Sequence, residues 1–387
     1  MKLRVEKVSF IKSWSLAERS AGTASSMNIF STVRMRADAS GVELQSTDIK
    51  TSIKCVANGV EVLEPGEAIM PIKGVTDLFK KAGAALFVIQ VDDGKAVMTS
   101  GRSRYSFSTY SASEFPDLPS SSDGSLFCSI KASALSSSLD RGTLCASEKE
   151  EFPQYISSAY FEVEGSQLNI VTTDKRRLAL SKADVTEAGE GKPMLLPVRS
   201  VKEFQRILGM MDGDPDIKIL FDDAQAYFTA PGMEFAVRKV EANFPAYARI
   251  LPTASSTTMY VDKQEITAAI ERVDVVVRDY NRTVIMNLSS GGECVLSGRA
   301  PEFGEAVENI TCEVNGETLK SGFNTKYFLD AVKAIDEPMA SLTFNGAGSH
   351  MVVKSKDSDA FLCMVAPLEL SREEMESEET AQAGDVF

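Results

Sequence analysis

The stretch "TTDKRRLALSK", residues 172–182, interrupts a β-like run with one acidic and three basic residues. A β-like segment at 168–173 precedes the charges, and Leu178-Ala179-Leu180 follows them. A charged turn between two strands is the simplest interpretation. The pair Thr173-Asp174 also repeats Thr47-Asp48, which lies 126 residues upstream (173 − 47). This spacing is the first sign of an internal repeat.

Other landmarks recur with the same period. Three predicted helices start near positions 71, 197 and 323, spaced 126 and 126 residues apart (197 − 71 and 323 − 197). An earlier helix precedes each of them, and apolar residues recur in it at intervals of three and four. These earlier helices are expected at residues 8–19, 132–141 and 263–276. Because several landmarks share one period, we predict a triplicated unit of two helices and antiparallel strands, which is an α+β fold.

The domain boundaries follow from the period and from local composition. The Pro/Ser/Gly-rich segment "PDLPSSSDG" (116–124) separates the first two units, and residues 245–258 separate the second and third. We therefore expect domains at 1–122, 123–252 and 253–370. Residues 371–387 are acidic and poor in apolar side chains, so they predict a disordered tail.

Composition is that of a globular protein with an unusual charge. The chain has 387 residues, of which 43% are hydrophobic and 25% charged, and a formal net charge of −14. That charge argues against a simple nucleic-acid binder, which usually has a basic balance. No run of about 18 apolar residues predicts a membrane span. Six scattered cysteines without a C-x-x-C pair favour reduced thiols in the cytoplasm over disulfides or a zinc site.

No motif for covalent chemistry stands out. The only histidine, His350, cannot be placed beside a catalytic serine or cysteine, and neither phosphate-binding glycine motif occurs. A hydrolytic enzyme stays open, but we favour a repeat protein that acts by its shape. We expect no catalytic residue, no cofactor and no metal.

Five segments resemble a known family. They are "SGRSRYSFST" (100–109), "VTTDKRRLAL" (171–180), "NFPAYARILP" (243–252), "GFNTKYFLDAV" (322–332) and "MVAPLEL" (364–370). In this order and spacing they are similar to the bacterial sliding clamps, the β subunits of DNA polymerase III, over residues 1–370. The resemblance implies three clamp domains per chain and two chains closed head to tail into a ring around duplex DNA. It also implies a processivity factor that holds the replicative polymerase, the clamp loader and repair proteins through short peptides. The alternative is a three-repeat scaffold that reuses the fold without DNA.

A ring resolves the charge problem, because encircled DNA needs little contact free energy and tight phosphate binding would impede sliding. The resemblance implies that cations on the helices face the DNA. They are Lys12, Arg19, Lys73, Lys80, Lys81, Arg141, Arg199, Lys202, Arg206, Arg272, Lys326 and Lys333. Relatives carry a basic residue in the loop 21–26, where this chain has Ala24.

The resemblance also implies a groove that receives partner peptides. Its residues would be Ile156, Thr173, Lys175, Arg176, Arg177, Leu178, Pro245, Arg249, Ile250, His350, Met364, Val365, Ala366, Pro367, Leu368 and Leu370. Apolar walls would bury an anchor, while Arg177 and Arg249 would donate hydrogen bonds to the peptide. Relatives usually have glycine at position 175, often histidine at 176, and Met-Pro-Met at 366–368. These departures predict a preference for more acidic peptides.

The resemblance also implies a ring interface between the first domain of one chain and the third domain of the other. Tyr105 and Phe107 share one side of a strand, and Val275 and Val276 would be their apolar partners. Opposite charges would flank them. The predicted interface residues are Arg102, Arg104, Tyr105, Phe107, Val275, Val276, Glu302, Glu305 and Glu308.

Overall fold

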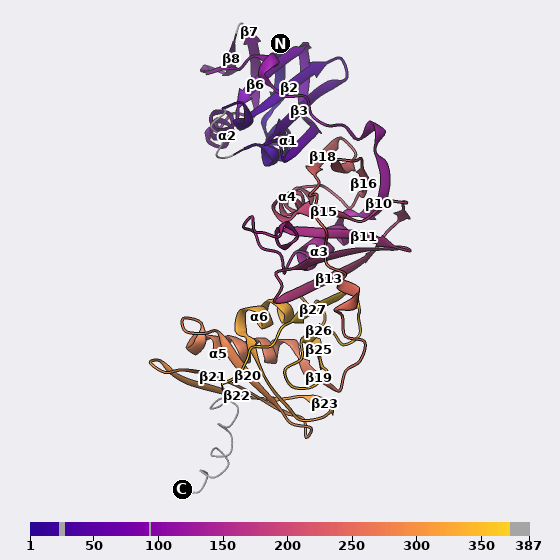
Figure 1. The fold of residues 1–387 in the computed structure, drawn as a ribbon. Coiled ribbons are helices and arrows are strands. Elements are labelled where there is room, and N and C mark those ends of the chain that lie inside the picture. The colour runs from indigo at the N-terminus through magenta and orange to yellow at the C-terminus, as the bar shows by residue number, and fades with distance from the viewer. Residues whose placement is uncertain (23–27, 93, 372–387) are drawn as a thin grey trace. The chain divides into compact units, whose positions relative to one another are not determined.

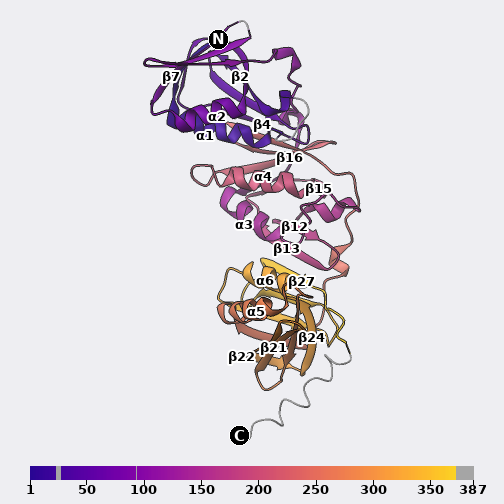
Figure 2. The same cartoon turned by 90° about the vertical axis from the view of Figure 1, so that its left-hand side faces the viewer.

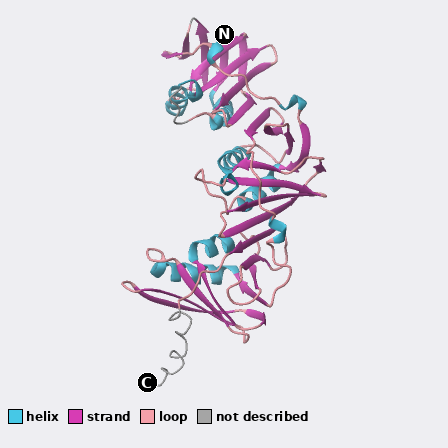
Figure 3. Cartoon of the chain, in the orientation of Figure 1, coloured by secondary structure: helices cyan, strands magenta, loops and turns pink. Residues whose placement is uncertain are grey.

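The computed structural model describes residues 1–22, 28–92 and 94–371 (Figure 1). Ala24 and residues 372–387 of the expected tail lie outside the described residues. Helices and antiparallel strands alternate along the chain, as the α+β prediction requires (Figure 3). The chain divides into two compact units. The first comprises residues 1–139, 161–168 and 183–241, and the second comprises residues 140–160, 169–182 and 242–387.

The described segments contain six α-helices, close to the predicted ones. They are α1 Lys7–Ala17, α2 Ile72–Lys81, α3 Ala132–Gly142, α4 Val198–Leu208, α5 Lys263–Val277 and α6 Thr325–Lys333. No helix among the described residues is long and apolar enough to cross a membrane.

The starts of α2, α4 and α6 follow the predicted 126-residue period once exactly and once with a deviation of one residue. The N-caps of α2, α4 and α6 are Pro71, Pro197 and Asn324, so the spacing is 126 and then 127 residues (197 − 71 and 324 − 197). The prediction for α6 was therefore one residue too early. The side chain of Asn324 accepts a hydrogen bond from the Tyr327 N–H at 3.2 Å, which fixes this start, whereas the two prolines offer no side-chain acceptor.

Twenty-seven strands occur in the described segments. They are β1 Lys2–Glu6, β2 Thr32–Asp38, β3 Gly41–Thr47, β4 Thr51–Val56, β5 Val60–Glu64, β6 Gly66–Pro71, β7 Leu86–Asp92, β8 Lys95–Ser100, β9 Ser103–Ser108, β10 Ser125–Lys131, β11 Ser158–Glu164, β12 Gln167–Thr173, β13 Arg177–Asp184, β14 Glu187–Ala188, β15 Met194–Pro197, β16 Asp216–Phe221, β17 Gln225–Ala230, β18 Met233–Arg238, β19 Thr257–Asp262, β20 Thr283–Leu288, β21 Glu293–Ala300, β22 Gly304–Thr311, β23 Glu313–Gly316, β24 Leu319–Asn324, β25 Met339–Phe344, β26 Met351–Ser355 and β27 Phe361–Val365.

The first unit contains a five-stranded sheet, β5-β1-β7-β8-β9, and a nine-stranded sheet, β14-β10-β16-β17-β18-β4-β3-β2-β6. Helices α1 and α2 lie side by side (Figure 2). The ring of Phe79 on α2 lies 5.4 Å from that of Phe10 on α1 and 5.2 Å from that of Phe87 on β7, measured between ring centroids. Trp14 is fully buried and donates from Nε1 to the Thr76 hydroxyl at 2.9 Å, so its one polar group is satisfied. Aromatic packing thus holds the helix pair against the sheets.

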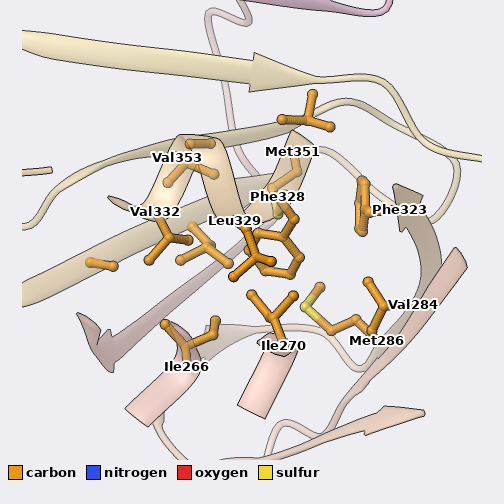
Figure 4. Close-up of a cluster of buried hydrophobic side chains, with 14 of the residues drawn as sticks. Ile266, Ile270, Val284, Met286, Phe323, Phe328, Leu329, Val332, Met351 and Val353 are labelled. Atoms are coloured by element: carbon orange, nitrogen blue, oxygen red, sulfur yellow. The ribbon is translucent and has the colours of Figure 1, made fainter. Parts of the chain in front are cut away.

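The second unit contains a four-stranded sheet, β22-β21-β20-β24, and a larger sheet with the order β11-β12-β13-β27-β26-β25-β19-β23. Helix α5 packs on β20, β21 and β22, while α6 packs on β24, β26 and β27. Ile270 from α5, Phe328 and Val332 from α6, and Met286 from β20 meet in one buried cluster (Figure 4). Fully burying such a side chain contributes about 1.5–3 kcal/mol. This core fixes α6 beside β27, the strand that pairs with β13.

Candidate functional site

The charged turn of the opening stretch is a rigid loop between β12 and β13. The Thr173 hydroxyl donates to the Arg177 carbonyl at 2.7 Å and accepts from the Lys175 N–H at 3.1 Å. One carboxylate oxygen of Asp174 accepts from the N–H groups of Arg176 and Arg177, each at 3.0 Å. Lys175 has a φ of 73°, which is the left-handed region that favours glycine. Side-chain hydrogen bonds therefore hold the turn and project Lys175 and Arg176 outward.

A pocket of about 230 Å³ lies beside this turn, within the second unit. Its floor includes Leu178 and Met364, which are direct partners across the β13–β27 pair. The complete lining is Tyr155, Thr173, Lys175, Arg176, Arg177, Leu178, Pro245, Ile250, His350 and Met364. The structure thus brings nine of the sixteen predicted groove residues to one cavity.

Tyr155 is the lining residue that the sequence reasoning missed. It follows Pro153 in the short helical turn Gln154–Ser157, and its ring contacts Phe244 at 5.9 Å. Phe244 also stacks on Tyr160 at 4.8 Å and so positions the neighbouring Pro245 against the pocket. An aromatic residue two positions after a proline was the only signal in the sequence, and it did not indicate which segment Tyr155 would meet.

Arg177 lines the pocket and is also bound to two carboxylates. Its guanidinium donates to Asp174 at 2.9 Å and to Asp330 on α6 at 2.8 Å, and it lies 4.3 Å from the centre of the Tyr327 ring. Only 10% of the side chain is exposed. These contacts make Arg177 a tie between the β13 turn and α6 as well as a lining residue of the pocket.

Asp330 is held ionised by this tie. Burial opposes ionisation of its carboxyl, but hydrogen bonds from Lys326 and Arg177 outweigh burial and keep the pKa of Asp330 below its usual range. The paired charges leave Arg177 fixed under the turn.

The rim of the pocket is positive. Lys175, Arg176 and Arg249 are exposed, and none of the three has an acidic partner among the residues that the structure describes. Arg249 lies in the short helical turn Tyr247–Arg249, directly before the pocket residue Ile250. Exposed His350 lines the same cavity. An apolar floor under unpaired cations suits a peptide with apolar anchors and acidic residues.

The remaining predicted groove residues support the pocket instead of lining it. Ile156 and Val365 are buried at 5% and 0% exposure. The Ala366 N–H donates to the Arg176 carbonyl at 2.8 Å, and the Leu368 N–H donates to the Gly322 carbonyl at 2.8 Å. Pro367 lies between these two bonds. A Cβ on Gly322 would lie 2.5 Å from the Leu370 side chain, so glycine is needed there for Leu370 to pack on β24.

Most of the predicted DNA-facing cations are neutralised by nearby carboxylates. Seven of the twelve form ion pairs: Lys12 with Asp212, Arg19 and Arg206 with Glu203, Arg141 with Asp336, Arg272 with Glu308, Lys326 with Asp330, and Lys333 with Glu271. Arg199 and Lys202 also have partners. Within the described ranges, only Lys73, Lys80 and Lys81 of the twelve lack one, and all three lie on α2.

Seven of the nine predicted interface residues lie on or beside two sheet edges, and the other two, Val275 and Val276, lie on α5. Strand β9 ends the five-stranded sheet of the first unit, and β22 ends the four-stranded sheet of the second. Arg102 and Arg104 are exposed beside or on β9, and Glu302 and Glu305 are exposed beside or on β22. A free strand edge offers unpaired backbone groups to another chain.

Three of the interface residues are engaged inside their own domain. A Cβ on Gly74 of α2 would lie 2.7 Å from the Phe107 ring, so Phe107 packs on that helix. Val276 packs against the buried core, whereas Val275 is 51% exposed. Glu308 accepts two hydrogen bonds from Arg272, at 2.8 and 2.6 Å. These hydrogen bonds keep the pKa of the Glu308 carboxyl below its usual range.

Two apolar residues at the β22 edge were not among the named interface residues, although they lie in the same segment as Glu302, Glu305 and Glu308. Phe303 and Val307 are 71% and 54% exposed. Both belong to the hairpin of β21 and β22.

Pairs of helices that repeat along the chain on antiparallel sheets, with a small pocket and free strand edges, are the features of a DNA sliding clamp. The chain matches the N-terminal, central and C-terminal domain models of the DNA polymerase III beta subunit over residues 1–119, 129–246 and 248–369. It belongs to the DNA polymerase III beta subunit family.

Two curated relatives align with this chain over almost the full length of both proteins. The beta sliding clamp of Staphylococcus epidermidis is 27% identical over 379 residues, which cover 95% of this chain and 99% of the relative. That of Pseudomonas aeruginosa is 26% identical over 372 residues, covering 96% and 100%. A crystal structure of the P. aeruginosa clamp bound to griselimycin has a TM-score of 0.89 at 26% identity, covering 96% of this chain and all of that one. A Bacillus subtilis clamp structure, at 23% identity and a TM-score of 0.90, supports the fold alone.

Proposed function

We propose that two copies of this chain close head to tail into a ring around duplex DNA and tether the replicative polymerase to it. The observation that carries this proposal is the pair of complementary sheet edges. Edge β9 is bordered by exposed arginines, and edge β22 by exposed glutamates and by exposed Phe303 and Val307. A head-to-tail interface of this kind closes when the rotation between the chains completes a circle.

The ion pairing of the helix cations is compatible with DNA that slides through the ring. Ion pairs with nearby carboxylates lower the number of helix cations that can replace counterions on the phosphates. Such a surface repels DNA less than a bare acidic one, yet forms few tight contacts. Retention then comes from ring topology, in the cytoplasm and without catalysis.

Burial of the cysteines agrees with a non-catalytic role. Burial raises the pKa of Cys55 and Cys128 to about 12, so these thiols stay protonated near neutral pH. No group of three potential metal-ligating side chains occurs among the described residues.

Partners would dock their peptides in the pocket beside the 173–177 turn. Leu178, Ile250 and Met364 offer the apolar surface, and Lys175, Arg176 and Arg249 offer charge. The polymerase, the clamp loader and repair proteins would then compete for one site per chain.

The ring is tested with Val275→Asp, an exposed position beside the β22 edge. We expect native mass spectrometry and sedimentation to show a dimer for the parent and a folded monomer for the variant. The control is Val8→Asp on α1, since Val8 is 63% exposed and outside the proposed interface. An unchanged dimer mass for Val275→Asp at low micromolar concentration would contradict the interface.

Encirclement is tested on DNA topology. The parent, loaded onto nicked circular DNA by a clamp loader, should be retained on gel filtration and lost when the circle is linearised. Retention on linear DNA would indicate ordinary contact binding, and no retention on circles would indicate a scaffold without a DNA role.

A further inference from the structure

We infer that the acidic segment 372–387 of this chain occupies the pocket beside the 173–177 turn and competes with partner peptides. The inference rests on the proposed peptide-binding role of that pocket, and it assigns the pocket an intramolecular ligand. Its support comes from three observations: unpaired charge, an apolar floor, and the position at which the segment leaves the fold.

The charges of the two partners are complementary. Residues 372–387 contain six acidic side chains and one basic one: Glu373, Glu374, Glu376, Glu378, Glu379 and Asp385, with Arg372. The rim cations Lys175, Arg176 and Arg249 have no acidic partner among the described residues. By contrast, carboxylates engage Arg177 and most helix cations. The pocket rim is therefore an uncompensated positive site in an acidic chain.

The pocket also suits the apolar part of the segment. Val386 and Phe387 follow Asp385, which makes a short acidic-apolar sequence. The 230 Å³ cavity is smaller than the roughly 300–1,000 Å³ typical of drug-sized ligands, which fits a few side chains. Its lining includes Leu178, Ile250 and Met364.

The residues that precede segment 372–387 pack near elements that border the pocket. Leu370 packs on Gly322, and the adjacent Ser321 accepts at its hydroxyl from the Gly348 N–H at 3.4 Å. Gly348 lies two residues before the pocket residue His350. The last described residues and the cavity thus belong to the same compact unit, and the segment at 321–322 contacts both Leu370 and the loop that precedes His350.

Fourteen residues, 371–384, separate Leu370 from Asp385. A flexible chain of that length has an average end-to-end span of roughly 19–22 Å. A peptide on such a tether acts at an effective concentration near millimolar. Even a segment with an intrinsic dissociation constant of about 0.5 mM would then weaken a competing peptide roughly threefold.

The first experiment compares the full chain with residues 1–371. The probe is Gln-Leu-Ser-Leu-Phe with an amidated C-terminus and an uncharged fluorescent dye on its N-terminus, so the probe carries no charge and salt acts mainly on the tail. We expect the truncated chain to bind this probe about threefold more tightly at about 50 mM salt. The difference should fall below about 1.5-fold at about 500 mM salt, because screening weakens exposed charge pairs.

Matched variants locate the effect. Lys175→Asn with Arg176→Ser in the full chain should abolish the difference, and asparagine tolerates the left-handed backbone at 175. The control Lys50→Ser alters the corresponding residue of the 47–51 turn and should leave the difference intact. Replacing all five tail glutamates by glutamine, or Phe387→Ser, should give part of the gain in probe affinity that the truncation gives.

A second measurement separates this inference from the proposed function. A labelled peptide of residues 372–387 is titrated with chain 1–371. Binding that Arg176→Ser weakens supports self-occupancy, whether or not the pentapeptide binds. No binding up to several millimolar overturns it.

The two failures are distinct. If the pentapeptide binds both chain lengths equally and the tail peptide does not bind, self-occupancy is wrong and the groove stands. If the pentapeptide binds neither chain, the partner-docking role fails. A difference that disappears on dilution of the clamp would mean that a second copy supplies the tail, and this would overturn occupancy within the chain.

Discussion

The turns at residues 47–51 and 173–177 have the same backbone conformation and differ in the side chains around them. In the first unit, the Thr47 hydroxyl donates to the Thr51 carbonyl at 2.7 Å and accepts from the Ile49 N–H at 2.9 Å. In the second, Thr173 makes the same two bonds at 2.7 and 3.1 Å. Each turn also has a left-handed third residue, with φ of 78° at Ile49 and 73° at Lys175.

The strands behind the turns match as well. The Arg238 N–H donates to the Lys50 carbonyl at 3.0 Å, and the Ala366 N–H donates to the Arg176 carbonyl at 2.8 Å. In each case the chain crosses to a strand from the following repeat, through the pairs β4–β18 and β13–β27.

The side chains are what differ. Where β13 pairs Leu178 with Met364, β4 pairs Ser52 with Ala236. The fifth turn residue is Arg177 in one and Thr51 in the other, and only Arg177 reaches across to α6. The repeat therefore supplies a common frame, and large apolar and charged side chains convert one copy into a candidate binding site.

The largest expected effect concerns the fifth turn residue. Arg177→Ala leaves the carboxylate of Asp330 half-buried with only Lys326, so we expect a loss of about 2–3 kcal/mol of unfolding free energy. The matched change Thr51→Ala removes one hydrogen bond, to Asp48 at 3.0 Å, and should cost about 0.5–1 kcal/mol. Thermal unfolding followed by circular dichroism measures both. Equal losses would show that Arg177 has no special role in tying the turn to α6.

The second effect concerns the pocket wall. Ile250 lines the pocket and is 48% exposed, so Ile250→Ala should barely change stability. It should weaken binding of labelled Gln-Leu-Ser-Leu-Phe about five- to tenfold, which is roughly 1–1.4 kcal/mol. Ile49→Ala is the matched control, since Ile49 is 62% exposed beside the other turn. Anisotropy titrations that show equal losses, or none, would contradict the assignment of the binding site.

The third effect is a pH dependence found only in the second turn. Asp330→Asn should cost about 1–2 kcal/mol at pH 7, because the charged partners of the carboxylate are lost. The folded-state pKa of Asp330 is below its unfolded value of about 3.9, so its contribution is present above pH 4 and disappears as pH falls through the folded value. Denaturant unfolding at a series of pH values from 7 to 2 should therefore show a difference between parent and variant that is constant above about pH 4 and shrinks as the pH falls further. A difference that stays constant over this whole range would mean that ionisation of Asp330 is irrelevant.

The smallest effect tests the shared frame itself. Asparagine tolerates a left-handed backbone better than isoleucine or lysine, so Ile49→Asn and Lys175→Asn should each stabilise the fold by about 0.5–1 kcal/mol. Both gains should have the same sign in thermal melts. Destabilisation by either change would show that the two turns do not share this conformation.

Much of this frame was predictable from the sequence. The recurrence of Thr-Asp after 126 residues located both turns, and the three-four periodicity located the helices within two residues. These features depend on local chemistry, in which a side-chain oxygen caps nearby N–H groups and an apolar stripe faces a sheet. The third repeat deviated where Asn324 shifted the start of α6 by one residue.

The pairing of charges was not predictable, because it depends on contacts between distant segments. Arg177 and Asp330 are 153 residues apart, and Arg141 and Asp336 are 195 apart. The sequence did not indicate that Asp174, Asp330 and Tyr327 would surround the guanidinium of Arg177. Likewise, nothing local indicated that Glu308 would pair with Arg272 inside its own domain.

The central claim is that one of two equivalent turns binds partner peptides because of its side chains. Hydrogen exchange with mass spectrometry, on the full chain with and without saturating Gln-Leu-Ser-Leu-Phe, tests it directly. We predict slower exchange in segments that cover residues 173–178 and 350–366, with no change at 47–52. Protection of residues 47–52 to the same extent, or protection there alone, would contradict the claim.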